Sequence, residues 1–384
     1  YAPPHPCACY IGAKLYGFNA LATKNPQHPV WQKTPDNQRL IKGASPTAKF
    51  VDYEDENNWP MYRHNKRRSG ATTSSVKAVS KKKWQLKLGG ELTPPVIADN
   101  KVFIAQKNQH TVNAVDAENG RLLWRFTAGG RIDSAPTLYK KRCYFGCTDG
   151  FIYCLDSNTG KLIWKFQGAP SAAQHMYFEH IESTHPLHGS VLIHDDKIYA
   201  VAGRSMFIDG GMNFLILDAE TGKKLTEIVM DDKVPGTDKQ LQMQHELLNM
   251  PQALNDLLSC DGKQIHMRLQ DFDLQGKRLG LKYSSRLYGK TGSQLERESI
   301  YKKFDDNSGD GAHIISGTGY LDDSWWHRTY WSYGKNYTSG FNGYFQTGRK
   351  APSGRIISFD DDGLFSFGRM TQYYRWAMIY EYYL

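Results

Sequence analysis

A repeat with a period of about 40 residues is the feature that most constrains this chain. Two segments, 92–126 and 133–166, align so that equivalent residues recur at an offset of 40. The recurring pairs are Asp116 and Asp156, Gly120 and Gly160, Leu122 and Leu162, Trp124 and Trp164, and Phe126 and Phe166. Weaker copies follow at 197–223, 272–277 and 355–367, and residues 13–20 read as the strand of another copy. Self-similarity at this period predicts stacked copies of one supersecondary unit.

One repeat reads as short strands joined by tight turns. In the second copy an apolar strand, 151–155, follows the turn residues 148–150, and Asp156 to Gly160 form the next turn. The aspartate can accept backbone N–H bonds there, and glycine supplies a positive φ. An outer strand follows, in which Trp164 is placed to pack between neighbouring sheets. Because one such sheet cannot bury both of its faces, the sequence predicts an all-β propeller of four-stranded antiparallel blades, with about six blades' worth of repeats.

Charge and hydropathy exclude some classes of protein. The formal charge is +9, and basic residues cluster at 66–68 and 81–83, which we interpret as solvated loops. No nucleic-acid recognition motif accompanies this charge, so nucleic acid is not an expected partner. No run of 18 apolar residues occurs, so the sequence predicts no membrane-spanning helix.

The six cysteines form no C-x-x-C pair and no haem-attachment motif. Cys147 and Cys154 are expected to lie within one hairpin, where they could face each other. The pattern is compatible with buried free thiols or with a disulfide, and a disulfide would indicate an oxidising compartment.

Two segments suggest binding or metal chemistry. Residues 306–311 (DNSGDG) match the first half of a calcium loop, with Asp306, Ser308 and Asp310 as the candidate ligands. The twelfth position is Gly317 and not Glu, which excludes an EF-hand; the alternative is a solvated polar turn. An aromatic and charged cluster predicts a carbohydrate or peptide platform, and packing between blades is the alternative. Its candidate binding residues are Asp322, Asp323, Trp325, Trp326, His327 and Arg328, with Arg204, Ser205 and Asp209 expected on the same rim.

A histidine-rich insertion interrupts the period of the repeat. Its spacings fit no standard zinc site, so we interpret these side chains as ordinary loop histidines. They are His175, His180, His185, His188 and His194.

The unit Asp-x-x-Thr/Asn-Gly-Lys/Arg-x-x-Trp at 116–124 and 156–164 resembles the PQQ-like, or quinoprotein-type, β-propeller repeat. Residues 58–64, 202–205 and 319–328 resemble one branch of bacterial extracytoplasmic members of this family. The resemblance implies a propeller that typically closes with eight blades, and a periplasmic or cell-envelope location.

The resemblance also implies two main functions that this chain could have. The first is a non-catalytic binding or scaffolding module for a protein or a cell-envelope glycan. The second is a PQQ-dependent oxidoreductase with a site at the central channel, where family enzymes hold PQQ between a tryptophan and a ring of adjacent cysteines, beside calcium. This chain has no adjacent cysteines; Cys7 and Cys9 come nearest. A third possibility is a structural module of a larger enzyme.

The expected organisation has three parts. Residues 1–23 supply strands that complete a blade, 24–80 form a linker anchored by Trp59 and Tyr62, and 81–384 hold the propeller repeats. Insertions are expected at 167–187, 229–254 and 281–312. The chain begins at Tyr1 and is expected to be a piece of a longer polypeptide.

Overall fold

The computed structural model is an all-β protein, as the repeat predicts. It describes residues 27–44, 50–53, 57–75, 81–177, 179–189, 191–241, 255–268, 270–279, 313–316, 331–334 and 352–368. Over these ranges no helix has the length and hydropathy needed to span a membrane.

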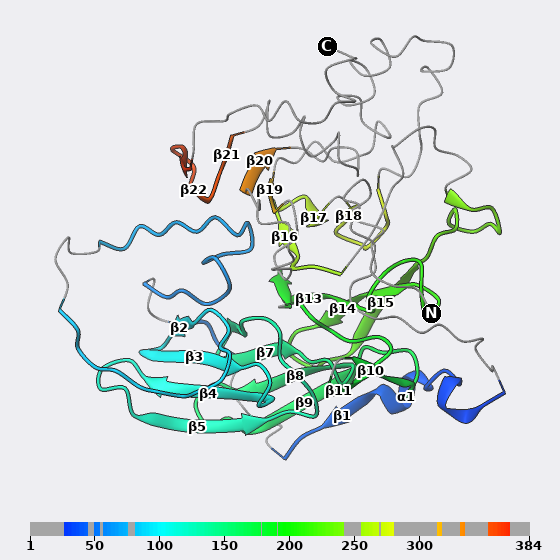
Figure 1. Ribbon diagram of the computed structural model, residues 1–384, viewed down its shortest axis with the longest axis horizontal. Helices are drawn as coiled ribbons and strands as arrows, with labels where there is room; N and C mark the ends of the chain where they lie inside the picture. The colour runs from blue at the N-terminus through cyan, green and yellow to red at the C-terminus, as the bar shows by residue number, and fades with distance from the viewer. Residues whose placement is uncertain are drawn as a thin grey trace, which may run out of the picture.

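Three sheets, two with four strands and one with a fifth strand added at its edge, form the best-defined part of the described chain (Figure 1). Blade 1 consists of β2 (Val96–Ala98), β3 (Lys101–Gln106), β4 (Thr111–Asp116) and β5 (Leu122–Thr127). Blade 2 consists of β6 (Thr137–Tyr139), β7 (Arg142–Gly146), β8 (Phe151–Asp156) and β9 (Leu162–Gln167). Blade 3 consists of β12 (Leu192–His194), β13 (Lys197–Ala202), β14 (Met212–Asp218) and β15 (Lys224–Met230). Consecutive strands pair antiparallel in each.

Smaller sheets continue the series along the described residues. Blade 4 consists of β16 (Ser259–Cys260), β17 (Gln264–Met267) and β18 (Gln270–Asp273), and blade 5 of β19 (His313–Ser316), β20 (Trp331–Gly334) and β21 (Ser353–Gly354). A last pair is β22 (Ile356–Phe359) with β23 (Leu364–Phe367), and a separate hairpin joins β10 (Gln174–Tyr177) to β11 (His180–Ser183). Before the blades come a 3-10 turn η2 (Pro29–Trp31), the helix α1 (Asp36–Arg39) and β1 (Leu40–Lys42).

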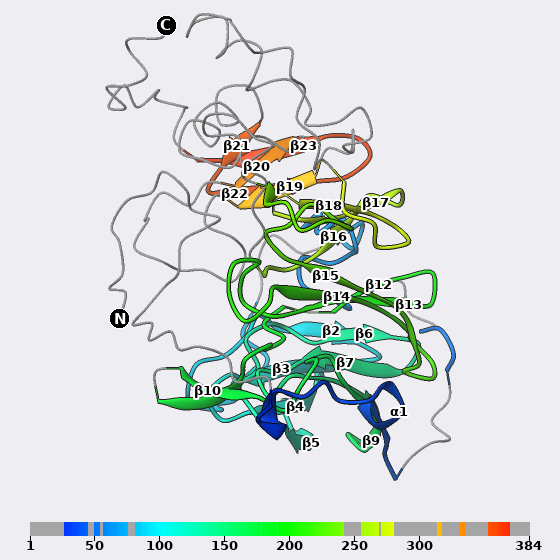
Figure 2. The same cartoon turned by 90° about the vertical axis from the view of Figure 1, so that its right-hand side faces the viewer.

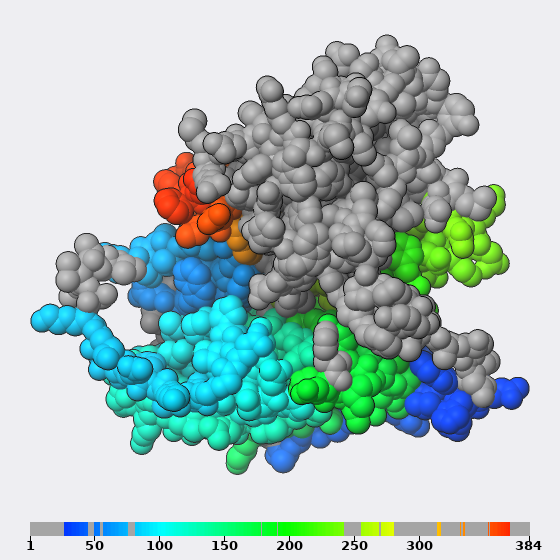
Figure 3. Space-filling model, viewed as in Figure 1, coloured from blue at the N-terminus to red at the C-terminus, as the bar shows by residue number. Residues whose placement is uncertain are grey.

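The sheets stack on one another around a common centre. The first strands of successive blades are neighbours: β2 contacts β6, β6 contacts β12, β12 contacts β16, and β16 contacts β19. Figure 2 shows the same order from blades 1 and 2 at the bottom to β19–β23 at the top, and Figure 3 shows blades 1 to 3, cyan to green, as one continuous body. This arrangement confirms the predicted propeller architecture.

The repeated aspartate turn forms as predicted. Asp156 Oδ1 accepts hydrogen bonds from the N–H groups of Asn158 and Thr159, at 2.8 and 2.9 Å. Gly160 closes the turn with φ +69°. A side chain there would be strained, and its Cβ would come within 2.6 Å of Trp124.

The tryptophan of one blade docks on this turn in the next blade. Each indole Nε1–H donates to a backbone carbonyl of the neighbouring turn, at 2.9–3.1 Å: Trp84 to Ala117, Trp124 to Ser157, and Trp164 to Glu220. The equivalence of Trp124 and Trp164 therefore holds in three dimensions. Trp84 follows the same rule, although residues 81–88 form no strand.

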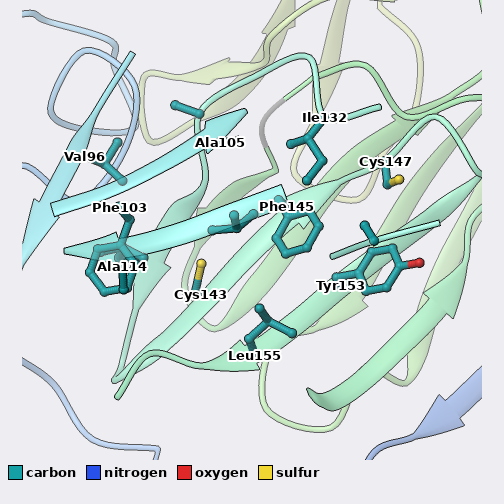
Figure 4. Close-up of a cluster of buried hydrophobic side chains, with 14 of the residues drawn as sticks. Val96, Phe103, Ala105, Ala114, Ile132, Cys143, Phe145, Cys147, Tyr153 and Leu155 are labelled. Carbon is teal, nitrogen blue, oxygen red and sulfur yellow. The ribbon is translucent and has the colours of Figure 1, made fainter. Parts of the chain in front are cut away.

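Apolar side chains from two sheets fill each space between blades. Between blades 1 and 2, Phe103 and Ala114 meet Cys143, Phe145 and Leu155, all fully buried (Figure 4). Similar clusters join blade 2 to blade 3 and blade 3 to blade 4. Full burial of a large side chain stabilises a fold by roughly 1.5–3 kcal/mol, so these clusters hold the blades together.

Of the two alternatives left open for the cysteines, the described residues agree with buried free thiols, and Cys147 and Cys154 do not face each other. Cys154 lies opposite Tyr144 in the register of β7 and β8, while Cys147 lies beyond the end of β7. Both are buried free thiols, as are Cys143 and Cys260. Burial raises the pKa of Cys154 to about 12, so this thiol is unreactive at neutral pH.

Residues 59–69, named here the axial segment, run along the inner strands of the propeller (Figure 1, blue, between β2 and β22). Backbone hydrogen bonds of 2.7–3.0 Å join them in chain order to four strands: Trp59 to Ile97 of β2, Pro60 to Leu138 of β6, Lys66 to Cys260 of β16, and Ser69 to Phe359 of β22. The segment thus satisfies backbone groups that the inner edges would otherwise leave unpaired.

The basic run 66–68 is therefore not a solvated loop, contrary to the prediction. Arg68 is fully buried, and its Nε donates to the carbonyl of Leu258 at 2.9 Å. Arg67 pairs with Asp361 at 2.7 Å. Sequence pattern alone missed this because arginines buried by backbone carbonyls have the same local signature as exposed ones.

A second part of residues 24–80 binds the outside of the ring. β1 pairs antiparallel with β9 and adds an edge strand to blade 2. Beside it, the buried Arg39 donates to the carbonyl of Gln167 at 2.8 Å and pairs with Glu227 of β15 at 2.6 Å. This contact ties blade 2 to blade 3.

We expect Trp164→Ala to lower the free energy of unfolding by about 3–5 kcal/mol, because it removes a fully buried indole and its hydrogen bond to the next blade. Trp84→Ala is the matched control, since Trp84 makes the same hydrogen bond but is half-exposed. Urea unfolding followed by circular dichroism measures both. Equal losses in the two variants would contradict the role given to burial.

Candidate functional site

The antiparallel order of each blade sends its loops to two opposite ends. Turns between the first and second strands, and between the third and fourth, share one end. The other end carries the turns between the second and third strands and the links to the next blade. These are residues 107–110, 128–136, 147–150, 168–191 and 203–211, named here the loop face. Loops held on a rigid scaffold are where binding residues concentrate.

An ionic network joins two neighbouring links on the loop face. His188 Nδ1 lies 2.6 Å from Asp133 Oδ2, and Arg131 Nε donates to the other oxygen of Asp133. Arg131 also reaches Glu182 of β11, with 3.0 Å between its terminal nitrogen and Oε1. Its guanidinium lies 5.3 Å from the ring centre of Tyr177, in cation–π range.

The pKa values of the two carboxylates in this network are shifted in opposite directions. Burial alone would raise the pKa of Asp133, but hydrogen bonds from His188 and Arg131 hold it well below its usual range. Burial raises the pKa of Glu182, and the charge of Arg131 only partly opposes this. Glu182 is 1% exposed, and neither oxygen accepts a hydrogen bond from the described residues. Glu182 thus has an ion pair with Arg131 but no hydrogen bond from the described residues, and a buried carboxylate in this state is costly and typical of a functional position.

Two of the predicted binding residues lie together on the same face. Arg204 pairs with Asp209 at 2.6 Å across the turn of blade 3, and each side chain is partly exposed. Ser205 is buried within this turn, where its Oγ accepts a hydrogen bond from the N–H of Phe207 at 3.2 Å. Burial and then the charge of Arg204 lower the pKa of His175.

The remaining predicted residues fall outside the described part of the chain. They are the platform residues Asp322, Asp323, Trp325, Trp326, His327 and Arg328, and the calcium candidates Asp306, Ser308 and Asp310. Their roles stay predictions.

The sequence interpretation did not foresee the bond between His188 and Asp133. The two residues lie 55 positions apart, and no spacing rule links a residue before β6 to one before β12. His194 likewise contacts a residue remote in the sequence, because its Nδ1 lies 3.0 Å from Nζ of Lys66 in the axial segment. The links that precede adjacent inner strands meet only once the ring forms.

A second polar cluster lies between blades 4 and 5. One potential ligand atom from each of His266, Asp271 and His313 lies within 4.8 Å of the others, and all three residues are buried. Burial would lower the pKa of His266, but Asp261 and Asp271 raise it to about 9, which reports a strongly negative surrounding. This is the group of described residues with the donor set for a metal.

The described residues do not fit the quinone arrangement that the resemblance implies. The four described cysteines are single buried thiols between blades, and no two cysteines of the chain are adjacent. The axial segment runs along the inner strands and forms backbone hydrogen bonds with them.

A cavity of about 440 Å³ lies at the end of the ring opposite the loop face. Tyr53, the axial residues Met61 and Lys66, and Tyr139 and Lys140 from the first turn of blade 2 contribute to its wall. Its size is in the range of small-ligand sites.

Comparison with known proteins finds similarity over part of the chain. Residues 64–239 match the family described as outer membrane protein assembly factor BamB. The dehydrogenase subunit of a quinone alcohol dehydrogenase from Gluconobacter oxydans is 29% identical over 147 residues, which are 35% of this chain and 18% of that protein. The corresponding subunit from Komagataeibacter europaeus is 30% identical over 156 residues, 36% of this chain and 20% of that protein. The chain thus spans about a fifth of the length of these relatives.

Two of the solved structures with a similar fold are a quinohaemoprotein and a BamB protein. A quinohaemoprotein alcohol dehydrogenase from Pseudomonas putida has a TM-score of 0.36 at 19% identity, over 53% of this chain and 31% of its own. BamB from Moraxella catarrhalis has a TM-score of 0.28 at 17% identity, over 51% of this chain and 62% of its own.

We expect Glu182→Gln to raise the free energy of unfolding at pH 7. The pKa of Glu182 is higher in the folded state than its ordinary 4.5, so the carboxyl favours folding below pH 4.5 and opposes it as pH rises through the folded pKa. Glutamine cannot ionise, so this penalty disappears. Urea unfolding at pH 4 and pH 7 measures the difference.

The control is Asp133→Asn, which has the opposite sign. The pKa of Asp133 is lowered below its ordinary 3.8, so its carboxylate stabilises the fold above pH 3.8 and that stability is lost as pH falls further. Asp133→Asn should therefore destabilise the protein at pH 7. A loss of stability in both variants would refute the charge states assigned to the network.

Proposed function

We propose that this chain, whose residues 64–239 carry repeats of the PQQ-like β-propeller family, is a non-catalytic binding or scaffolding module of the bacterial cell envelope. It would present the loop face to a protein or glycan partner. The family description names an outer membrane assembly factor, which supports a scaffolding role outside the cytoplasm.

The axial segment is the observation that carries this proposal. Its backbone bonds to inner strands of blades 1, 2 and 4 and to β22, and its Arg68 is fully buried. A centre bonded in this way by the chain itself favours recognition at the rim over chemistry in a central channel.

The loop face has the composition of a recognition surface. Met176 and Ile181 pair across the hairpin β10–β11 and are 67% and 63% exposed. The charged groups of Arg131, Arg204 and Asp209 lie in the adjoining links and turn. Apolar side chains beside arginine and carboxylate groups are characteristic of protein interfaces.

The alternative function is a PQQ-dependent oxidoreductase. Its support is the identity of about 30% to subunits of quinone alcohol dehydrogenases over roughly a third of this chain. Purified protein incubated with PQQ and calcium distinguishes the two functions by dye-linked oxidation of alcohols and sugars. We expect no turnover, and turnover with any of these substrates would overturn the binding proposal.

We expect a photoreactive amino acid at position 181 to cross-link a specific envelope partner in cells. The control is the same replacement at position 229, because Val229 is also an exposed apolar strand residue, 53% exposed, but lies on the outer strand β15. Mass spectrometry of the adduct separates a protein partner from a glycan. Identical adducts from both positions, or none from position 181, would count against the loop face as the binding surface.

A further inference from the structure

Blade 4 departs from the repeat at one buried pair of positions. In blades 1 to 3 an aromatic residue of the second strand lies opposite a small or aliphatic residue of the third strand. These pairs are Phe103 and Ala114, Tyr144 and Cys154, and Tyr199 and Ile216. The equivalent pair in blade 4 is His266 and Asp271. Blade 4 therefore has an imidazole and a carboxylate at positions where blades 1 to 3 have apolar side chains.

The neighbouring blade supplies another nitrogen donor to the same space. His313 of β19 stacks on His266, with ring centres 4.0 Å apart and an angle of 7° between the rings. His266, Asp271 and His313 are 1%, 3% and 4% exposed. Two imidazoles and a carboxylate thus meet out of contact with bulk water, where polar groups need partners.

Hydrogen bonds leave one buried nitrogen of His266 without a partner. Its Nδ1 is 2.7 Å from Asp271 Oδ1, whereas its Nε2 has no hydrogen-bond partner among the described residues. The nearest charged oxygen to Nε2 is Asp261 Oδ2 at 3.8 Å, too far for a hydrogen bond. Asp261 is held in place because its Oδ1 accepts the N–H groups of Lys263 and Gln264, each at 2.7 Å.

His313 is oriented toward the cluster by its own backbone contact. Its Nε2 donates a hydrogen bond of 3.2 Å to the carbonyl oxygen of Arg268. A backbone carbonyl that fixes the tautomer of a histidine is the usual outer support of a metal-binding imidazole.

We propose that His266, Asp271 and His313 bind one divalent transition-metal ion of the zinc class between blades 4 and 5, once one of the two stacked imidazole rings turns so that both nitrogen lone pairs reach the ion, with Asp261 as the adjacent carboxylate. Metal binding would displace the proton of His266, and two imidazoles with carboxylate oxygen suit zinc and its neighbours, whereas calcium and magnesium prefer oxygen ligands alone. A divalent ion also balances the two carboxylates, which a single proton on His266 does not. The ion would join two blades whose contact here lacks the apolar packing of the other interfaces.

The test measures metal content and affinity in the full chain. Protein stripped with a chelator is titrated with Zn²⁺ by calorimetry and with Co²⁺ by absorption spectroscopy. We expect one tightly bound Zn²⁺ per chain, a Co²⁺ spectrum of low coordination number, and a higher melting temperature with Zn²⁺. His313→Ala should weaken binding by at least about 100-fold, as expected for loss of a direct ligand. His28→Ala, an exposed histidine, should bind as the unaltered chain does.

A double substitution separates metal binding from folding. His266→Tyr with Asp271→Ile introduces the pair that blade 3 has at Tyr199 and Ile216, so this variant should fold and lose the metal. Circular dichroism verifies folding in each variant. Folded protein that binds no Zn²⁺ at micromolar concentration would overturn the proposal. So would unchanged Zn²⁺ binding in the double variant, which would assign the metal to another site.

Discussion

The contact between one blade's tryptophan and the next blade's turn is the interaction on which this structure depends. A four-stranded sheet exposes two apolar faces, and only a neighbouring sheet can cover them. Trp124 and Trp164 each make two contacts with the next blade. The indole packs against a turn glycine, and its N–H donates to a backbone carbonyl. Because the same contact recurs from blade to blade, the ring is built from nearest-neighbour interfaces.

The inner edges of the blades carry backbone groups that need hydrogen-bond partners, and the axial segment supplies them. Backbone groups at the centre of a ring need partners, and residues 59–69 provide them from within the chain. The links and turns of the loop face are held at the other end of the blades and include both buried and exposed side chains. Glu182 and the exposed pair of Met176 and Ile181 lie there.

Polar residues at two places depart from the apolar pattern of the repeat. On the loop face, Asp133 and His188 pair between successive links; between blades 4 and 5, His266 and Asp271 replace an aromatic and an aliphatic residue. Buried polar groups are retained when they are satisfied by one another or by a ligand. The members of the first pair bond to each other, whereas in the second pair Nε2 of His266 has no hydrogen-bond partner within the part of the chain that the structure describes.

The sequence by itself determined the blades, because strand alternation, the turn at Asp156 to Gly160 and the placement of Trp164 are local and repeat at a constant offset. It could not predict that Cys154 faces Tyr144 or that Arg68 is buried, since both depend on register and on which segment enters the centre. The candidate sites belong to this second class. Asp133 meets His188, and His266 meets His313, only after separate blades have packed, because burial and the distance between remote residues are properties of the assembled ring.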